Sequence, residues 1–145
     1  MTNHAVNNGK ITVFGGAQQR PNIHVEDMSD LYVRCLQYAD SEIDGKVFNA
    51  GYENHTLMQI AQMVQCVVGE GIGRKVDIVS TPTDDNRSYR VSSNKICREL
   101  GFVPARTIGN AVESLVTAFI AGKVPNPMTD KIYYNIKTMQ AAGLI

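Results

Sequence analysis

The chain has 145 residues, in which 14 lysines and arginines balance 14 aspartates and glutamates. Apolar residues make up 43% and charged residues 19%, which is typical of a globular domain and argues against a disordered chain. Zero net charge argues against a broad surface for nucleic acid or anionic membrane, and it is compatible with self-association. No apolar run approaches the ~20 residues of a membrane span, and residues 1–10 are too polar for a signal peptide.

The cysteines indicate the redox compartment of the protein. Cys35, Cys66 and Cys97 are widely spaced, with no C-x-x-C pair and no nearby histidine pattern. This arrangement predicts reduced thiols in the core of a cytoplasmic protein and no metal site.

The predicted elements alternate between strands and helices, which favours the α/β class. In the first part of the chain we expect strands at 10–14 and 22–25, a helix over about 27–38, and a strand at 46–50 after the Asp44-Gly45 turn. The helix is indicated by apolar residues at helical spacing: Met28, Leu31, Tyr32, Cys35, Leu36 and Ala39.

The second part of the chain is expected to carry three clear helices. Thr56 and Gln59 fit a capping box, so one helix should begin at Leu57 and end at Gly69. The others should run from Ser92 or Ser93 to Leu100 and from Thr107 to Gly122. Residues 76–79 alternate like a strand, 87–91 suggest a short extended piece, and the mixed tail is compatible with a short helix over 133–142.

Arg20 is the strongest candidate for a binding residue. It follows the Gly15-Gly16 turn and opens the run Arg-Pro-Asn-Ile-His-Val-Glu-Asp-Met at 20–28. A guanidinium offers planar, bidentate hydrogen bonding that matches a pair of phosphate oxygens. The alternative is a salt bridge from Arg20 to Glu26 or to another nearby carboxylate.

Together, the strings at 11–16, 20–28 and 48–51 resemble the second half of an extended short-chain dehydrogenase/reductase. More narrowly, they resemble the NAD-dependent nucleotide-sugar epimerase/dehydratase family. The string at 91–102 resembles the family's strand and helix ending in Leu-Gly-aromatic, and the resemblance runs from about Ala5 to at least Ile120. It implies one small mixed α/β substrate-binding domain over residues 1–145, with a C-terminal tail after about residue 125 and the Rossmann domain mostly absent.

The resemblance also implies roles for individual residues near Arg20. Arg20 matches the arginine that contacts the diphosphate of the nucleotide-sugar. Thr12 and Phe14 match a strand that passes the nucleobase, although ordinary strand packing is an equal alternative for both. Asn22 matches the substrate-contact position two residues after the arginine, where relatives often place an aromatic residue and this chain has a small amide.

A second motif, residues 84–89, precedes the string at 91–102. Relatives commonly carry an Arg-Pro shortly before this point, whereas this chain has Thr81-Pro82. By the resemblance, Arg87 could take the place of that arginine, with Asp84 or Asp85 holding ribose hydroxyls. The alternative is a solvated acidic loop capped by Arg87.

Other candidates are interpreted as structural. Asp27 can cap the helix that follows it, His24 alternates with apolar neighbours, and Asn49 suits a strand end. Tyr133 and Lys137 satisfy the family's Tyr-x-x-x-Lys pattern but lie far from its expected place, so we interpret the match as a coincidence. The glycine-rich run 69–75 is not G-x-G-x-x-G and follows a helix, so it predicts a loop.

These observations predict the nucleotide-sugar-binding portion of an NAD(P)-dependent sugar epimerase or dehydratase, with no catalytic residue in this chain. NAD or NADP is expected in the complete enzyme, and none is expected to bind this chain alone. The expected partners are a nucleotide-diphosphate sugar and either a Rossmann half or a homo-oligomer, which would cover apolar faces of the 27–38 helix and the 48–51 strand. The alternatives are a stand-alone nucleotide-sugar-binding or assembly module without catalysis, and an interaction remnant without a ligand.

Overall fold

The computed structural model describes residues 1–85 and 87–144. Its elements are α1 (Thr2–Asn8), β1 (Lys10–Phe14), β2 (Gln19–Asn22), α2 (Val25–Cys35), α3 (Asp40–Ile43), β3 (Glu53–Thr56), α4 (Leu57–Ile72), β4 (Asp77–Thr81), α5 (Asn94–Leu100), α6 (Ile108–Ile120), the 3₁₀ helix η1 (Lys131–Tyr133) and α7 (Asn135–Ala141). The predicted mixed α/β class is confirmed.

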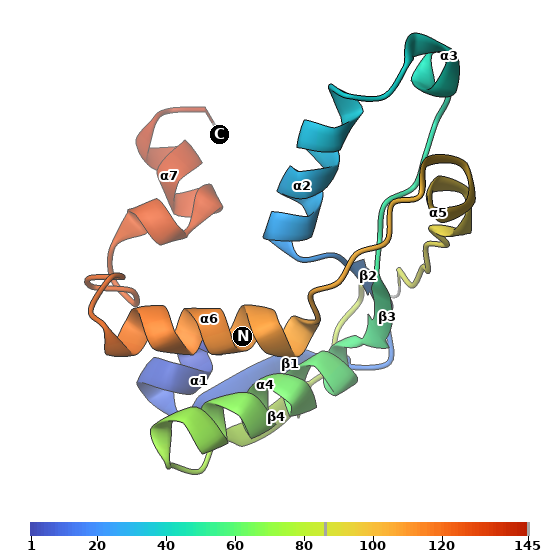
Figure 1. Ribbon diagram of the computed structural model, residues 1–145. Helices are drawn as coiled ribbons and strands as arrows, with labels where there is room; N and C mark the ends of the chain where they lie inside the picture. The colour runs from blue at the N-terminus through green and yellow to red at the C-terminus, as the bar shows by residue number, and fades with distance from the viewer. Residues whose placement is uncertain (86, 145) are drawn as a thin grey trace.

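The larger core lies between a two-stranded parallel sheet and three helices. β1 pairs with β4 in the register Lys10↔Asp77 to Phe14↔Thr81, and α1, α4 and α6 pack together with this sheet (Figure 1). Alternate residues of β1 are buried, so Ile11 and Val13 face the helices and the remaining side chains face outward. The buried members of this core are Ala5, Ile11, Val13, Ala61, Val64, Val68, Val76, Val112 and Val116.

A smaller apolar cluster joins α2 to α5. Leu31 of α2 is buried with Ile96 and Leu100 of α5 and with Phe102, which follows that helix. The antiparallel pair β2–β3 runs between this cluster and the larger core, with Arg20 opposite His55. The chain therefore folds around two apolar clusters that are linked by a short ribbon (Figure 1).

The helix boundaries around the capping motifs agree with the sequence. Thr56 and Thr107 each form a capping box, with Gln59 and Asn110 respectively, and α4 and α6 begin immediately after them. Gly101 takes a left-handed conformation and ends α5, as predicted.

The predicted limits of two helices are wrong: the helix expected over about 27–38 is α2, Val25–Cys35, and the helix expected to end at Gly69 is longer. α4 continues through Gly69 to Ile72 and ends at Gly73, which has φ 65°. A glycine inside a helix costs only about 1 kcal/mol, and the apolar stripe of α4 continues to Val68 and Ile72 in the larger core. At the start of α2, His24 is the cap residue in place of Asp27, because its Nδ1 accepts the Glu26 N–H at 3.1 Å.

Three predicted strands also differ. The second strand covers Gln19–Asn22 instead of 22–25, because β3 offers its partner there and His24 is used as a helix cap. Residues 46–50 pair with no strand among the described residues. Residues 87–91 are held by isolated bonds, from Tyr89 N–H to Gln19 O and between Val91 and the Asn54 amide, and form no ladder.

The cysteines are free. Cys66 and Cys97 are exposed, so the prediction of core thiols is wrong for these two, whereas the half-buried Cys35 packs against the smaller apolar cluster. The tail folds into η1 and α7, which lie beyond the end of α6 (Figure 1). In the described part of the chain, no helix is both long and apolar enough to cross a membrane.

Candidate functional site

Arg20, Asp85 and Arg87 form one charged group, called here the arginine cluster. Asp85 Oδ1 accepts from Arg87 Nε at 2.7 Å, and Asp85 Oδ2 accepts from Arg87 Nη2 at 2.9 Å. Arg20 Nη2 lies 3.6 Å from Asp85 Oδ2, and Arg20 Nη1 donates to the carbonyls of Gln19 and Arg87. The fold therefore brings the two predicted arginines together although 67 residues separate them.

The two arginines stabilise the charged form of Asp85, and Asp85 stabilises the charged form of Arg87. Hydrogen bonds from the Arg87 side chain and backbone, aided by the charges of Arg87 and Arg20, hold the pKa of Asp85 far below its usual range. The same contact raises the pKa of Arg87. The carboxylate is therefore anionic at all ordinary pH values, and it occupies the donor groups that a phosphate would use. An anionic ligand has to share or replace Asp85.

Thr12 and Phe14 lie on the outer face of β1, away from the core. Their cross-strand neighbours on β4 are Val79 and Thr81, and the Phe14 ring is 61% exposed. Packing in the core therefore does not account for this ring. An exposed aromatic side chain next to a small hydroxyl offers a flat apolar surface on which a nucleobase can stack.

Gln18 connects the outer face of β1 to the arginine cluster. It is 7% exposed, its Oε1 accepts the Gly16 N–H at 2.7 Å, and its Nε2 donates to the carbonyls of Phe14 at 3.2 Å and Asp85 at 2.8 Å. One buried side chain thus fixes the end of β1 against the loop that carries Asp85. Sequence reasoning missed Gln18, because nothing in the local pattern distinguishes a buried glutamine from an exposed one after a Gly-Gly turn.

The remaining candidate residues of the two motifs add no side chain to the arginine cluster. Asn22 Nδ2 donates to the Arg20 carbonyl at 2.8 Å, and Asn22 lines a small cavity with His24 and Arg106 instead of the cluster. Asp84 is exposed. Asn86, which belongs to the predicted 84–89 motif, lies outside the described residues.

The glycine-rich run 69–75 and the Tyr133/Lys137 pair do not form the sites that they imitate. Gly69 and Gly71 are inside α4 and Gly73 closes it, so this run does not have the strand–turn–helix geometry of a dinucleotide site. Lys137 Nζ lies 4.4 Å from the ring centre of Tyr134, and Tyr133 is in the separate helix η1. Neither feature therefore has the geometry of a dinucleotide or catalytic site.

Part of the chain matches a known protein family, and the fold matches solved structures. Residues 1–51 match the model of the NAD dependent epimerase/dehydratase family. The chain carries part of an epimerase/dehydratase fold. No curated protein sequence matches it significantly.

Solved structures with this epimerase/dehydratase fold include three whose names are informative. A UDP-glucuronic acid 4-epimerase from Bacillus cereus superposes with a TM-score of 0.67 at 16% identity, over 83% of this chain and 38% of that one. A dTDP-glucose 4,6-dehydratase from Bacillus anthracis gives 0.65 at 19% identity, over 91% and 40%. An ADP-L-glycero-D-manno-heptose-6-epimerase from Helicobacter pylori gives 0.66 at 14% identity, over 83% and 36%. This chain thus spans well under half the length of each.

Proposed function

We propose that this chain is the nucleotide-sugar-binding part of an NAD(P)-dependent sugar epimerase or dehydratase. The observation that carries the proposal is that Arg20 and Arg87 converge on Asp85, while Gln18 holds this cluster against the strand that exposes Phe14. Guanidinium groups suit the diphosphate, and the Phe14 ring suits the base. Structures of this fold include one with UDP-glucuronic acid and NAD, which is consistent with such a ligand.

In this proposal the chain positions the sugar and does no chemistry on it. Arg20 is less exposed than Arg87, at 22% against 83% of the side chain, and it lies 5.4 Å from the ring centre of Tyr89. Arg20 is thus the fixed donor, and Arg87 can turn from Asp85 to a phosphate at a small energetic cost, because exposed ion pairs contribute only about 0–1 kcal/mol. NAD(P), when bound by the complete enzyme, supplies hydride transfer.

The proposal is tested by titrating the chain with UDP-glucose and dTDP-glucose in a calorimeter. Arg20→Ala should weaken binding roughly ten- to a hundredfold, because a charge-assisted hydrogen bond contributes about 1.5–3 kcal/mol. Arg98→Ala, on the exposed side of α5, is the matched control and should change nothing. Equal affinity of wild type and Arg20→Ala would show that Arg20 does not contact the ligand. Turnover of either nucleotide-sugar by the chain with NAD added would contradict the non-catalytic role.

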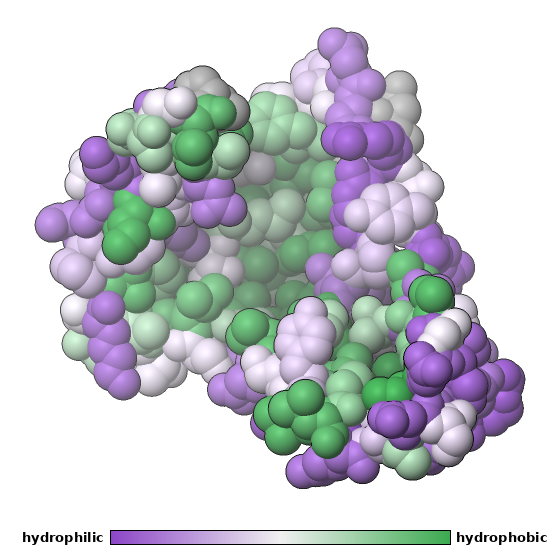
Figure 2. Space-filling model, turned by 90° about the horizontal axis from the view of Figure 1, so that it is seen from above, coloured by the Kyte–Doolittle hydropathy of each residue, from purple (hydrophilic) through white to green (hydrophobic). Residues whose placement is uncertain are grey.

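The partner in this proposal is a dinucleotide-binding half, which covers an apolar face of α2 and the 46–50 segment. Exposed apolar side chains gather there, and a hollow with apolar walls opens on the face seen in Figure 2. Those on α2 and in the segment are Val25, Tyr32, Val33, Leu36 and Val47. The unpaired extended segment can also add a strand to a neighbouring sheet.

This partner surface is tested by size-exclusion chromatography and binding of an apolar dye. The isolated chain should self-associate or bind the dye, and Leu36→Ser with Val47→Ser should reduce both effects. Ile136→Ser on α7 is the control, since Ile136 is similarly exposed but lies outside this face. A monodisperse monomer that binds no dye contradicts the proposal.

A further inference from the structure

Asp85 already fills the position at Arg87 that an anionic ligand would take. Its Oδ1 accepts from Arg87 Nε at 2.7 Å and from the Arg87 backbone N–H at 3.1 Å, and its Oδ2 accepts from Arg87 Nη2 at 2.9 Å. This is the parallel, two-oxygen geometry in which a guanidinium also binds a phosphate. A phosphate can make the same contact with Arg87 only after the Asp85 carboxylate has moved away.

Arg20 is held in a different way. Its Nη1 donates to the carbonyls of Gln19 and Arg87, and its guanidinium lies 5.4 Å from the ring centre of Tyr89. Its Nη2 is 3.6 Å from Asp85 Oδ2, which is longer than a hydrogen bond. The carboxylate therefore occupies the Arg87 guanidinium by direct contact and acts on Arg20 only through its charge.

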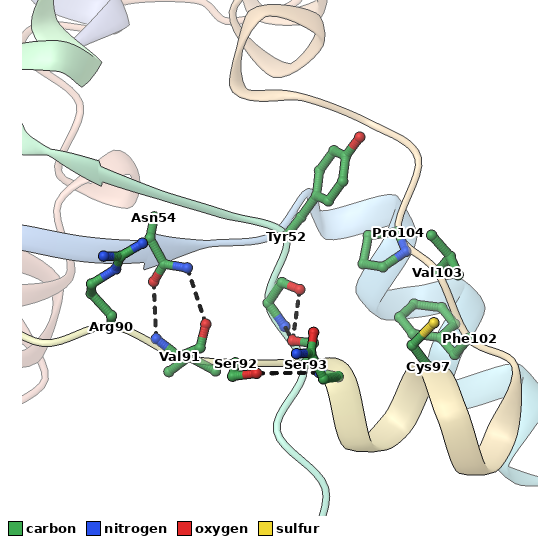
Figure 3. Close-up of a pocket in the computed structure, with 12 residues that line it drawn as sticks. Tyr52, Asn54, Arg90, Val91, Ser92, Ser93, Cys97, Phe102, Val103 and Pro104 are labelled. Atoms are coloured by element: carbon green, nitrogen blue, oxygen red, sulfur yellow. Dashed lines mark hydrogen bonds between the residues drawn. The ribbon is translucent and has the colours of Figure 1, made fainter.

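The loop that carries Asp85 and Arg87 is fixed on both sides. Before Arg87, the buried Gln18 donates to the Asp85 carbonyl at 2.8 Å. After it, the Asn54 amide donates to the Val91 carbonyl at 3.0 Å and accepts the Val91 N–H at 2.9 Å, as the dashed lines in Figure 3 show. The carboxylate thus stays close to the guanidinium, and its effective concentration there is high. A ligand can still reach the pair, because the Asp85 and Arg87 side chains are 38% and 83% exposed.

We propose that Asp85 is a built-in competitor for the phosphate groups of the ligand, and that a diphosphate binds by displacing it from Arg87. This inference rests on the proposed function, because it concerns the same two arginines. A diphosphate brings two anionic phosphoryl groups, one for each guanidinium, whereas Asp85 forms hydrogen bonds with Arg87 alone. Every ligand that takes Arg87 loses the same internal contact, so the site favours ligands whose charge spans both arginines over a simple monoanion.

The contacts favour this role over the ribose contact that the resemblance suggests for Asp85. Three N–H groups of Arg87 already occupy the two carboxylate oxygens, so a ribose hydroxyl would have to donate to a group that faces the guanidinium. The two roles also predict opposite effects of a substitution. Removing a competitor tightens binding of the diphosphate, whereas removing a ribose ligand weakens binding of the nucleotide.

Inorganic pyrophosphate is the direct probe, because it carries the diphosphate without a base or a sugar. In calorimetric titrations without divalent metal, Asp85→Asn and Asp85→Ala should bind it roughly three- to tenfold more tightly than wild type. The gain is expected because both variants lose a competing ion pair and a negative charge beside the ligand.

Asp84→Asn is the matched control, since it removes the same charge from the preceding residue. Asp84 is exposed and forms no ion pair with any described residue, and pyrophosphate has no ribose for it to contact. Its substitution should change the affinity by less than about twofold, because water and salt screen an exposed charge.

The gain should also depend on Arg87. In an Arg87→Ala background, Asp85→Asn should gain no more than Asp84→Asn does, because the contact for which Asp85 competes is already absent. The inference is overturned by a gain that persists in that background. It is also overturned by pyrophosphate binding that is unchanged, weaker or undetectable in both Asp85 variants.

The same titrations with UDP-glucose separate this inference from the proposed function. UDP-glucose that binds wild type, but binds the Asp85 variants no more tightly, would support the nucleotide-sugar site and overturn the competition by Asp85. Tighter pyrophosphate binding by the variants, without UDP-glucose binding to any form of the chain, would support the competition and contradict the nucleotide-sugar proposal.

Discussion

Arg106 Nη1 donates to Asp27 Oδ1 at 2.6 Å, joining α2 to the segment that leads into α6. The second carboxylate oxygen of Asp27 accepts the backbone N–H groups of Ala105 at 3.1 Å and Arg106 at 2.8 Å. Asp27 is only 3% exposed. The structural role predicted for Asp27 thus takes another form, because it fastens a distant segment and does not cap its own helix.

Asp27→Asn should destabilise the fold. The substitution removes the charge that faces Arg106, and breaking a buried ion pair typically costs about 3–5 kcal/mol. Since Arg106 is 37% exposed, we expect about 2–3 kcal/mol, which is measurable by urea unfolding. Asp30→Asn is the matched control, because Asp30 accepts from the same Nη1 at 2.9 Å but is 56% exposed. Equal effects of the two variants would contradict a special role for Asp27.

The contribution of Asp27 should depend on pH in one direction. Burial raises the pKa of this carboxyl, but the hydrogen bonds from Arg106 and Ala105 and the charge of Arg106 outweigh burial, and the net pKa is lowered. A carboxyl with a lowered folded-state pKa stabilises the fold above its unfolded pKa of about 3.9, and this contribution disappears as pH falls through the folded-state pKa. Urea unfolding from pH 7 to pH 2 should therefore show wild type approaching Asp27→Asn at the acid end. A constant difference between them would contradict this linkage.

Gly15→Ala should damage both the fold and the proposed site. Gly15 has φ 78°, and an added Cβ would lie 2.4 Å from Gln18 Nε2 and 2.7 Å from Thr83 Cγ2. Left-handed strain costs about 1–2 kcal/mol, and the displaced Gln18 would release the loop that holds Asp85. We expect a loss of about 2–4 kcal/mol in urea unfolding together with weaker nucleotide-sugar binding.

The matched control for that substitution is Gly45→Ala. Gly45 has a similar φ of 66°, but nothing lies within 4 Å of its added Cβ. It should therefore show only the backbone strain of about 1–2 kcal/mol, with binding unchanged. Similar losses in both variants would mean that the contact with Gln18 is unimportant.

Phe14→Ala should separate binding from stability. Because the ring is 61% exposed, its removal should change the free energy of unfolding by less than about 0.5 kcal/mol. Nucleotide-sugar binding, measured by calorimetry, should weaken about tenfold if the base stacks on the ring. The neighbouring Val13→Ala should behave in the opposite way, losing about 2 kcal/mol of stability because Val13 is fully buried. A strongly destabilised Phe14→Ala would favour a structural role.

The local features of this protein could be predicted from its sequence because they depend on near neighbours in the chain. The Thr56 and Thr107 capping boxes, the left-handed Gly101 and the alternation along β1 need only residues a few positions apart. The arginine motif and the strings around it indicated the epimerase/dehydratase resemblance in the same way, through short patterns in a fixed order.

Only the tertiary structure decided which distant groups meet. Glu26 was a predicted alternative partner for Arg20, yet it pairs with Arg106 at 2.8 Å, and Arg20 instead lies beside Asp85. Likewise, residues 46–50 have strand-like composition but no neighbouring strand in the described chain. Ion pairs and strand pairing depend on which segments the apolar cores bring together, and no short window of sequence contains both partners.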